Sequence, residues 1–159
     1  MRCLLLIGLT VLAAPASARD SLGVFGQWGA FSDPQVPRCY AIAQADSEKP
    51  ERPGSASIGT WPRAQVRGQL HVRLSRAMVP HASIRLAIGG QRFDLTGSGN
   101  DAWAQDRRMD AAVVAAMRSA AAMSVSATDR AGRRFTDRYS LEGAATAMDA
   151  ATVGCARAR

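Results

Sequence analysis

The sequence predicts a mostly-β domain, on the strength of two observations. Several stretches alternate apolar and polar residues, which is typical of strands that bury one face. One stretch between them has the three- and four-residue apolar spacing of a helix. Many strands with one clear helix between hairpins indicate a β-rich architecture. The chain has 159 residues, which suits a single domain with its own core.

The N-terminus has the three parts of a secretory signal peptide. Arg2 gives a short basic start, residues 4–13 are apolar, and residues 16–18 (Ala-Ser-Ala) form a small-residue cleavage site. A membrane anchor is the alternative, but a span needs about 20 apolar residues and this run is far shorter. We therefore predict a signal peptide over residues 1–18 and one globular domain over residues 19–159. The predicted location is the periplasm or the outer membrane, with no transmembrane segment after cleavage.

Cleavage would remove Cys3 and leave Cys39 and Cys155. An even number of cysteines in an exported domain favours a disulfide, while two buried free thiols remain the alternative. A bridge that closes so long a loop contributes on the order of 4–5 kcal/mol in the chain-entropy description. His71 and His81 are too few and too distant to complete a zinc site with these cysteines. We expect no metal and no cofactor.

Before the clear alternation, the sequence predicts two strands and a loop. Residues 24–31 are aromatic and spaced by glycines, and residues 39–43 are apolar, so each is a candidate strand. Residues 44–56 carry charges and prolines with little apolar content, which is typical of a loop.

Strong period-2 alternation follows in residues 69–75, 84–88 and 91–95. Gly89-Gly90 between the last two runs predicts a two-residue hairpin, because both turn positions require positive φ. The residues expected to face inward are Leu70, Val72, Leu74, Ile84, Leu86, Ile88 and Phe93.

The pattern then changes to a helical one. From Asp106, a predicted N-cap, an apolar stripe predicts a helix of about 12 residues. The stripe consists of Met109, Ala112, Val113, Ala116, Met117 and Ala120. Strands are predicted at 123–127 and 133–141, and residues 144–153 indicate a short helix or turn that delivers Cys155.

The charge of the chain suggests an anionic partner. The formal net charge is +7, and Lys49 is the only lysine among the basic residues. Nucleotide-composition bias in the genome is the alternative explanation for the abundance of arginine over lysine. If their strands are neighbours, Arg73, Arg85 and Arg92 share one outward face, although Asp94 would weaken it. Guanidinium groups suit phosphate and carboxylate, so an anionic envelope polymer is the expected ligand. Nucleic acid fits less well, because no stacking aromatics lie between these arginines.

Other chemistry is not indicated. His71 and His81 are expected to be exposed, and neither lies in a motif that would activate a serine. Asp94 and Asp101 flank Gly97-Ser98-Gly99-Asn100, which lacks the spacing of a calcium loop and is typical of a turn. The sequence therefore predicts a non-enzymatic protein.

The three tryptophans could instead mark a partner site. In a domain of this size, large aromatic residues usually belong to the core. We expect core positions for Trp28 and Trp103, and Trp61 is left open.

Two regions resemble a known family. Asp110, Met117-Arg118, Met123-x-Val125, Gly132, Tyr139-Ser140-Leu141-x-Gly143 and Ala147, together with Phe25-Gly26-x-Trp28 before Cys39, are similar to the invasion-associated locus B family of proteobacterial envelope proteins. The chain differs from many relatives by lacking further central cysteines and by having Ala144 where an aromatic residue often follows the glycine.

The resemblance implies an immunoglobulin-like β-sandwich exported to the periplasm or outer membrane, in a family first associated with host-cell invasion. The expected function is binding or structural support, with an anionic envelope polymer, an envelope protein or a host protein as partner. An exported hydrolase with a site that is not visible in the sequence is the alternative. The oligomeric state is left open.

Overall fold

The computed structural model describes residues 19–46 and 53–157. The predicted signal peptide lies outside these residues. The strands are β1 (Asp20–Phe25), β2 (Trp28–Asp33), β3 (Arg38–Gln44), β4 (Ser55–Trp61), β5 (Val66–Arg73), β6 (Ile84–Ile88), β7 (Gln91–Ser98), β8 (Asp101–Trp103), β9 (Ala122–Thr128) and β10 (Arg134–Ser140). The helices are α1 (Arg107–Met117), α2 (Ala144–Arg157) and a 3-10 turn, Pro62–Ala64.

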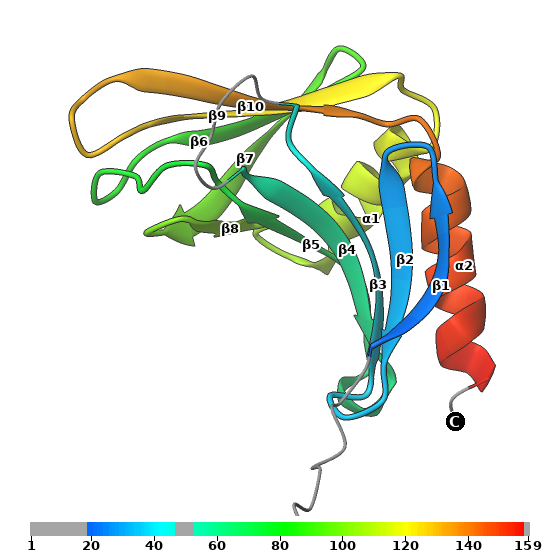
Figure 1. The fold of residues 1–159 in the computed structure, drawn as a ribbon. Helices are drawn as coiled ribbons and strands as arrows, with labels where there is room; N and C mark the ends of the chain where they lie inside the picture. Colours follow the sequence, from blue (N-terminus) through cyan, green and yellow to red (C-terminus); the bar gives the residue numbers. More distant parts are fainter. Residues whose placement is uncertain (1–18, 47–52, 158–159) are drawn as a thin grey trace, which may run out of the picture.

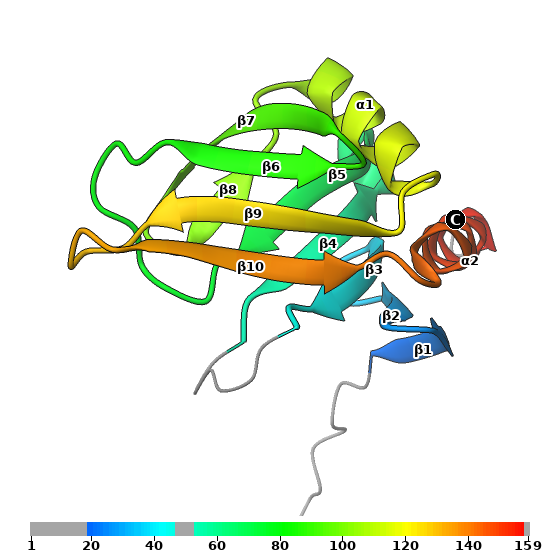
Figure 2. The same cartoon turned by 90° about the horizontal axis from the view of Figure 1, so that it is seen from above.

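All ten strands belong to one antiparallel sheet in the order β1-β2-β3-β4-β5-β8-β7-β6-β9-β10. The sheet folds over on itself, so that β6, β7, β9 and β10 form a layer above β3, β4, β5 and β8 (Figures 1 and 2). Strand β7 belongs to both parts, because Gln91–Leu95 pair with β6 and Thr96–Ser98 pair with β8. The mostly-β prediction is confirmed, and the two layers are consistent with a β-sandwich.

The core lies between the layers and follows the predicted alternation. Leu70, Val72, Leu74, Ile84, Leu86 and Ile88 are all at most 2 % exposed, whereas Phe93 is partly buried. Gly89 and Gly90 have positive φ and form the β6–β7 turn, as predicted. Trp28 is fully buried, and its Nε1 donates to the carbonyl of Ser140 at 2.9 Å. This hydrogen bond attaches the start of β2 to the end of β10.

Helix α1 begins as predicted and buries most of the predicted stripe, including Val113, Ala116 and Met117. The carboxylate of Asp106 accepts a hydrogen bond from the Met109 amide at 2.8 Å and caps the helix. Ala112, which was expected in the apolar stripe, is exposed, and Asp110 is buried instead. The Asp110 Oδ1 accepts a hydrogen bond from the Leu70 amide of β5 at 2.8 Å. A carboxylate is therefore part of the buried stripe, which an apolar pattern does not reveal.

Helix α2 is longer than the predicted helix or turn over 144–153, and it packs on β1, β2 and β3. Gly143 precedes it with a φ of +83°, a backbone conformation that favours glycine. Cys39 and Cys155 form a disulfide with a Cα–Cα distance of 5.6 Å, which confirms that pairing. Neither helix of the described residues is long and apolar enough to cross a membrane.

The strands differ from the sequence prediction in three places. The single strand expected over 24–31 is broken at Gly26-Gln27 into the β1–β2 hairpin. Strand β4 was missed, and its first two residues lie in the predicted loop over 44–56; residues 47–52 of that loop lie outside the described part. Strand β8 was also missed, although the turn predicted before it is present at Gly99-Asn100.

Candidate anion-binding surface

The outer face of the β6–β7–β9–β10 layer carries four exposed arginines, which we call the arginine face: Arg85, Arg92, Arg134 and Arg138. Residues that are paired across a sheet share a face, so the strand register fixes their arrangement. Arg92, Ala87, Ser124 and Arg138 form one row across the four strands. At the usual strand spacing, the ends of this row are about 14 Å apart.

A groove of about 290 Å³ crosses the same face. Arg85 and Arg134 line it together with four hydroxyl-bearing side chains, and the hydroxyls of Ser126 and Thr136 hydrogen-bond at 2.9 Å. The residues that line the groove are Ser83, Arg85, Ser126, Ala127, Thr128, Arg134, Phe135 and Thr136. Guanidinium and hydroxyl donors together suit the oxygens of phosphate, sulfate or carboxylate groups.

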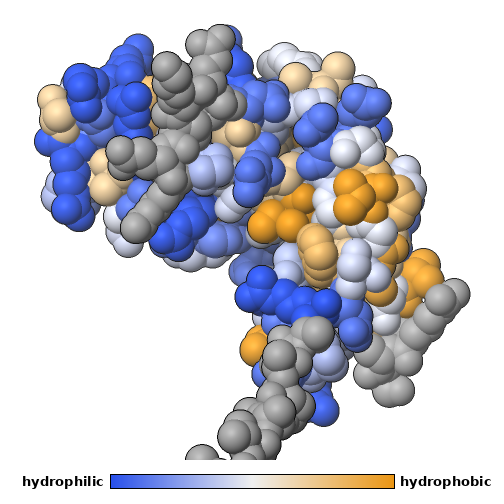
Figure 3. Space-filling model, viewed as in Figure 1, coloured by the Kyte–Doolittle hydropathy of each residue, from blue (hydrophilic) through white to orange (hydrophobic). Residues whose placement is uncertain are grey.

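Asp94 reduces the positive charge of the arginine face, as the sequence suggested. Its Oδ1 lies 3.5 Å from Nε of Arg85. The side chains of Arg85 and Asp94 are 55 % and 70 % exposed, and ion pairs in such a position contribute little, because water competes for both partners. Asp46, which is paired with Arg138 at the edge of β10, adds a second carboxylate, so the four arginines face two carboxylates and the net charge of the face stays positive. In Figure 3, which views this layer along its edge, orange atoms gather over β1–β3.

Arg73 is separated from the other two predicted arginines. It lies on β5, which β8 and β7 separate from β6, and its neighbours across the sheet are Ser55 and Asp101. Arg85 and Arg92 do lie on adjacent strands. Arg134 and Arg138 were not predicted, because their strand joins the face only through the pairing of β6 with β9.

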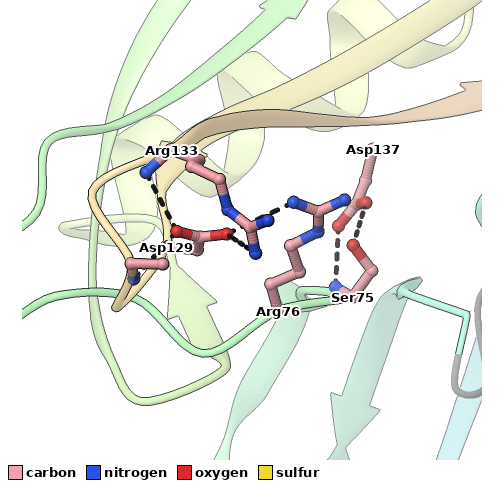
Figure 4. Close-up of polar contacts among 6 residues, drawn as sticks. Ser75, Arg76, Asp129, Arg133 and Asp137 are labelled. Atoms are coloured by element: carbon pink, nitrogen blue, oxygen red, sulfur yellow. Dashed lines mark hydrogen bonds and ion pairs between the residues drawn. The ribbon is translucent and has the colours of Figure 1, made fainter.

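A second polar cluster holds the β9–β10 turn against the segment that follows β5 (Figure 4). The Asp129 carboxylate is 6 % exposed and accepts hydrogen bonds from the amides of Arg133 and Ala131. The Arg133 amide is the main cause that lowers the pKa of Asp129, and the guanidinium of Arg76, 3.2 Å away, lowers it further. These groups satisfy one another, so the cluster stabilises the turn.

Asp137 forms the other half of the view in Figure 4. This buried carboxylate accepts hydrogen bonds from the Ser75 amide at 2.9 Å and from the Ser75 hydroxyl at 2.5 Å. A serine hydroxyl needs a base that can accept and pass on its proton, and a carboxylate alone is a weak one. The Ser75–Asp137 pair is accordingly a structural contact between the two layers.

The two histidines lie in different elements, His71 on β5 and His81 in the loop before β6. His81 is exposed in a loop, as expected. The His71 side chain is 33 % exposed, its Nε2 lies 2.9 Å from Asp101, and its ring stacks on Trp103. Among the described residues, no side-chain hydroxyl hydrogen-bonds to the His71 imidazole. His71 is thus only partly exposed, which corrects the sequence expectation for this residue.

The tryptophans divide between core and surface. Trp28 is in the core, as predicted. Trp103 was expected there too, but it is half-buried on the outer face of β8. Trp61 is also half-buried, and its ring lies over Gly59, where a Cβ atom would come within 2.6 Å of it. In the described part of the chain, no three His, Cys, Asp or Glu residues are grouped as a metal site would need.

These features define a small β-rich domain with an exposed, arginine-bearing sheet face and a C-terminal helix that a disulfide links to the sheet. The chain belongs to the invasion-associated locus B family, whose sequence profile matches residues 29–152. The match contains Cys39 and the motif positions from Asp110 to Ala147, while Phe25-Gly26-x-Trp28 falls just before it. Searches of the curated proteins and of the solved structures return no match to this chain.

Proposed function

We propose that the protein is an exported, non-enzymatic envelope domain that binds an anionic polymer through the arginine face. One observation carries this proposal, namely the gathering of Arg85, Arg92, Arg134 and Arg138 on one exposed sheet face. The hydroxyl-lined groove between Arg85 and Arg134 supplies further donors for an oxyanion. The signal-peptide pattern of residues 1–18 supports a location in the periplasm or at the outer membrane, where acidic polymers are abundant.

Binding of this kind depends on charge and on salt. Attraction between exposed charges is screened within about 10 Å at 0.1 M salt, so the affinity falls as the salt concentration rises. A surface with several arginines also raises the rate at which a polyanion associates. Such binding does not require the face to match the shape of the polymer closely, which agrees with a sheet face that carries long, exposed side chains.

The test uses immobilised lipopolysaccharide as the probe and neutral dextran as the blank. We expect the triple variant Arg85→Glu, Arg92→Glu, Arg138→Glu to bind at least about tenfold more weakly, because each exposed charge contributes a fraction of a kcal/mol. The matched control is Arg63→Glu, Arg107→Glu, Arg108→Glu, which changes the net charge equally and leaves the arginine face intact. Equal loss in both variants would mean that net charge alone causes binding.

Arg73 provides a second comparison. Because it lies on β5 beside Asp101 and away from the arginine face, Arg73→Glu should reduce binding less than Arg92→Glu does. The reverse order would relocate the binding surface to the outer face of β5 and β8.

The hydrolase alternative rests on the His71–Asp101 pair. It predicts an esterase or glycosidase activity that is lost in both His71→Ala and Asp101→Asn. The non-enzymatic proposal predicts that the wild-type protein shows no such activity above that of these two variants.

A further inference from the structure

An apolar cavity of about 240 Å³ lies between α1, α2 and the sheet, away from the arginine face. Ile58 of β4 and Gly68 of β5 line it from the sheet, and Val114 lines it from α1. From α2, the lining residues include Met148 and Ala151. We call this space the interhelix cavity.

The lining of the interhelix cavity is mainly hydrophobic. Ile58, Met148, Ala151 and Cys155 are all at most 6 % exposed and contribute to it. Ala156 at its edge is exposed, so the cavity is open to water. An alkyl chain that enters it would remove apolar surface from water, which is favourable.

The rim of the cavity is basic. Arg67 and Arg118 both line it, and Arg67 forms no ion pair within the described ranges. Nη2 of Arg118 donates to Oδ1 of Asp149 at 2.6 Å, and this pair joins the end of α1 to α2. Their side chains are 42 % and 62 % exposed, so neither group is sealed from a ligand. With one carboxylate facing two guanidinium groups, the rim has a net positive charge.

The size of the cavity restricts the ligand further. Pockets for drug-sized molecules measure roughly 300–1,000 Å³, and this one is smaller. It suits one short alkyl chain, and it is too small for a bulky molecule.

We propose that the interhelix cavity binds a single-chain anionic amphiphile, with the alkyl chain between α1 and α2 and the anionic head at Arg67 and Arg118. The proposal is independent of the arginine face, which lies on the other layer. A free fatty acid and an anionic lysophospholipid are the two sources of such a ligand, because both have one alkyl chain and an anionic head.

The test measures binding of decanoate to the purified, delipidated protein by isothermal titration calorimetry. Decanol and decyltrimethylammonium serve as neutral and cationic comparisons, and a lysophosphatidylglycerol distinguishes the second source. We expect decanoate or the lysolipid to bind, and decanol and the cation to bind at least about fivefold more weakly. Absence of binding by both anionic probes, or equal binding of the cation, would overturn the proposal.

Two pairs of variants locate the site. Val114→Phe fills the cavity and should abolish binding, whereas Ala112→Phe, on the exposed side of the same helix, should not. Arg67→Glu should weaken decanoate about threefold to tenfold without changing decanol, and Arg108→Glu should leave both unchanged. Arg67 is exposed, so this pair remains informative even if Val114→Phe fails to fold. Equal effects within either pair would contradict the assignment.

Discussion

Asp110 shows how one buried side chain connects the helix to the sheet. Burial raises the pKa of its carboxyl, the hydrogen bond from the Leu70 amide lowers it, and nearby Asp106 raises it again. The carboxylate lies in the first turn of α1, where the helix dipole also favours negative charge. Its main structural role is to satisfy a backbone donor of β5 that would otherwise be buried without a partner.

Two substitutions of Asp110 should therefore distinguish the effect of its hydrogen-bond acceptor on stability from the effect of its charge. Asp110→Ala leaves the Leu70 amide unsatisfied and should lower the free energy of unfolding by about 1–3 kcal/mol. Asp110→Asn keeps an acceptor oxygen and removes the poorly solvated charge, so its stability should be within about 1 kcal/mol of wild type. Urea unfolding of the two variants checks this, and similar losses in both would assign the role to the charge.

Asp129 makes the stability depend on pH in the acid range. Because its pKa is lower in the folded protein than the ordinary value of 3.8, the charged form stabilises the fold. This contribution is fully present above that value and is lost as the pH falls through the lower pKa of the folded state. The stability difference between wild type and Asp129→Asn should be constant near neutral pH and shrink as the pH falls below 3.8. Denaturation at a series of pH values measures it, and a gap that does not change with pH would refute the assignment.

At the scale of elements, the start of α2 depends on one glycine. Gly143 has a φ of +83°, and a Cβ atom there would collide with the carbonyl oxygen of Phe25 at the β1–β2 turn. Gly132, in the β9–β10 turn, has a similar φ of +75° with no atom within 4 Å of such a Cβ. The two positions share the backbone strain and differ in the space around them.

Alanine at these positions should give unequal losses. Gly132→Ala should cost about 1–2 kcal/mol from the left-handed backbone alone. Gly143→Ala should cost more than about 3 kcal/mol, because the chain must also move away from Phe25. Thermal or urea unfolding compares them, and equal losses would mean that the contact with Phe25 relaxes easily.

The elements also show where sequence reasoning succeeds. The β6–β7 hairpin follows from local information, since two glycines separate two alternating runs. In β4 the inward positions Ala56 and Ile58 alternate with serine and glycine, so the apolar signal is weak. Nothing in the sequence around Gly59 indicates that the ring of Trp61 covers it, as it does in the fold. Such partners become apparent only when the chain is folded.

The arginine face, too, could be predicted from the sequence only in part. Arg85 and Arg92 were placed together because a hairpin joins their strands. Arg134 and Arg138 belong to a strand that reaches the face through β9, and Arg73 leaves it because β8 and β7 intervene. Non-local pairing is fixed by burial of whole faces, and a single sequence gives no direct information on it.

At the scale of the whole molecule, the disulfide connects β3 to the C-terminal helix α2. Removing it with Cys39→Ser and Cys155→Ser should lower the free energy of unfolding on the order of 4–5 kcal/mol, because the open chain gains loop entropy. Urea unfolding of the double variant measures this. A loss below about 1 kcal/mol would show that packing of α2 on β1–β3 is sufficient without the bridge.

Export of the whole chain has a direct test by intact-mass spectrometry of protein purified from the periplasm. The predicted mass is that of a chain that begins at Arg19, with no thiol available to an alkylating reagent until a reductant is added. A retained Met1 would contradict the signal peptide, and alkylation without reduction would contradict the disulfide in the cell.

The position of the disulfide has a consequence for the order of folding. In an exported chain that crosses the membrane N-terminus first, Cys39 arrives early, and its partner arrives only with the last helix. Three cysteines would allow three different intramolecular pairs, but in the predicted mature chain Cys3 is removed with the signal peptide and only Cys39 and Cys155 remain. An exported chain cleaved in this way would need an oxidant and no disulfide isomerase, because no wrong bridge within the molecule could form.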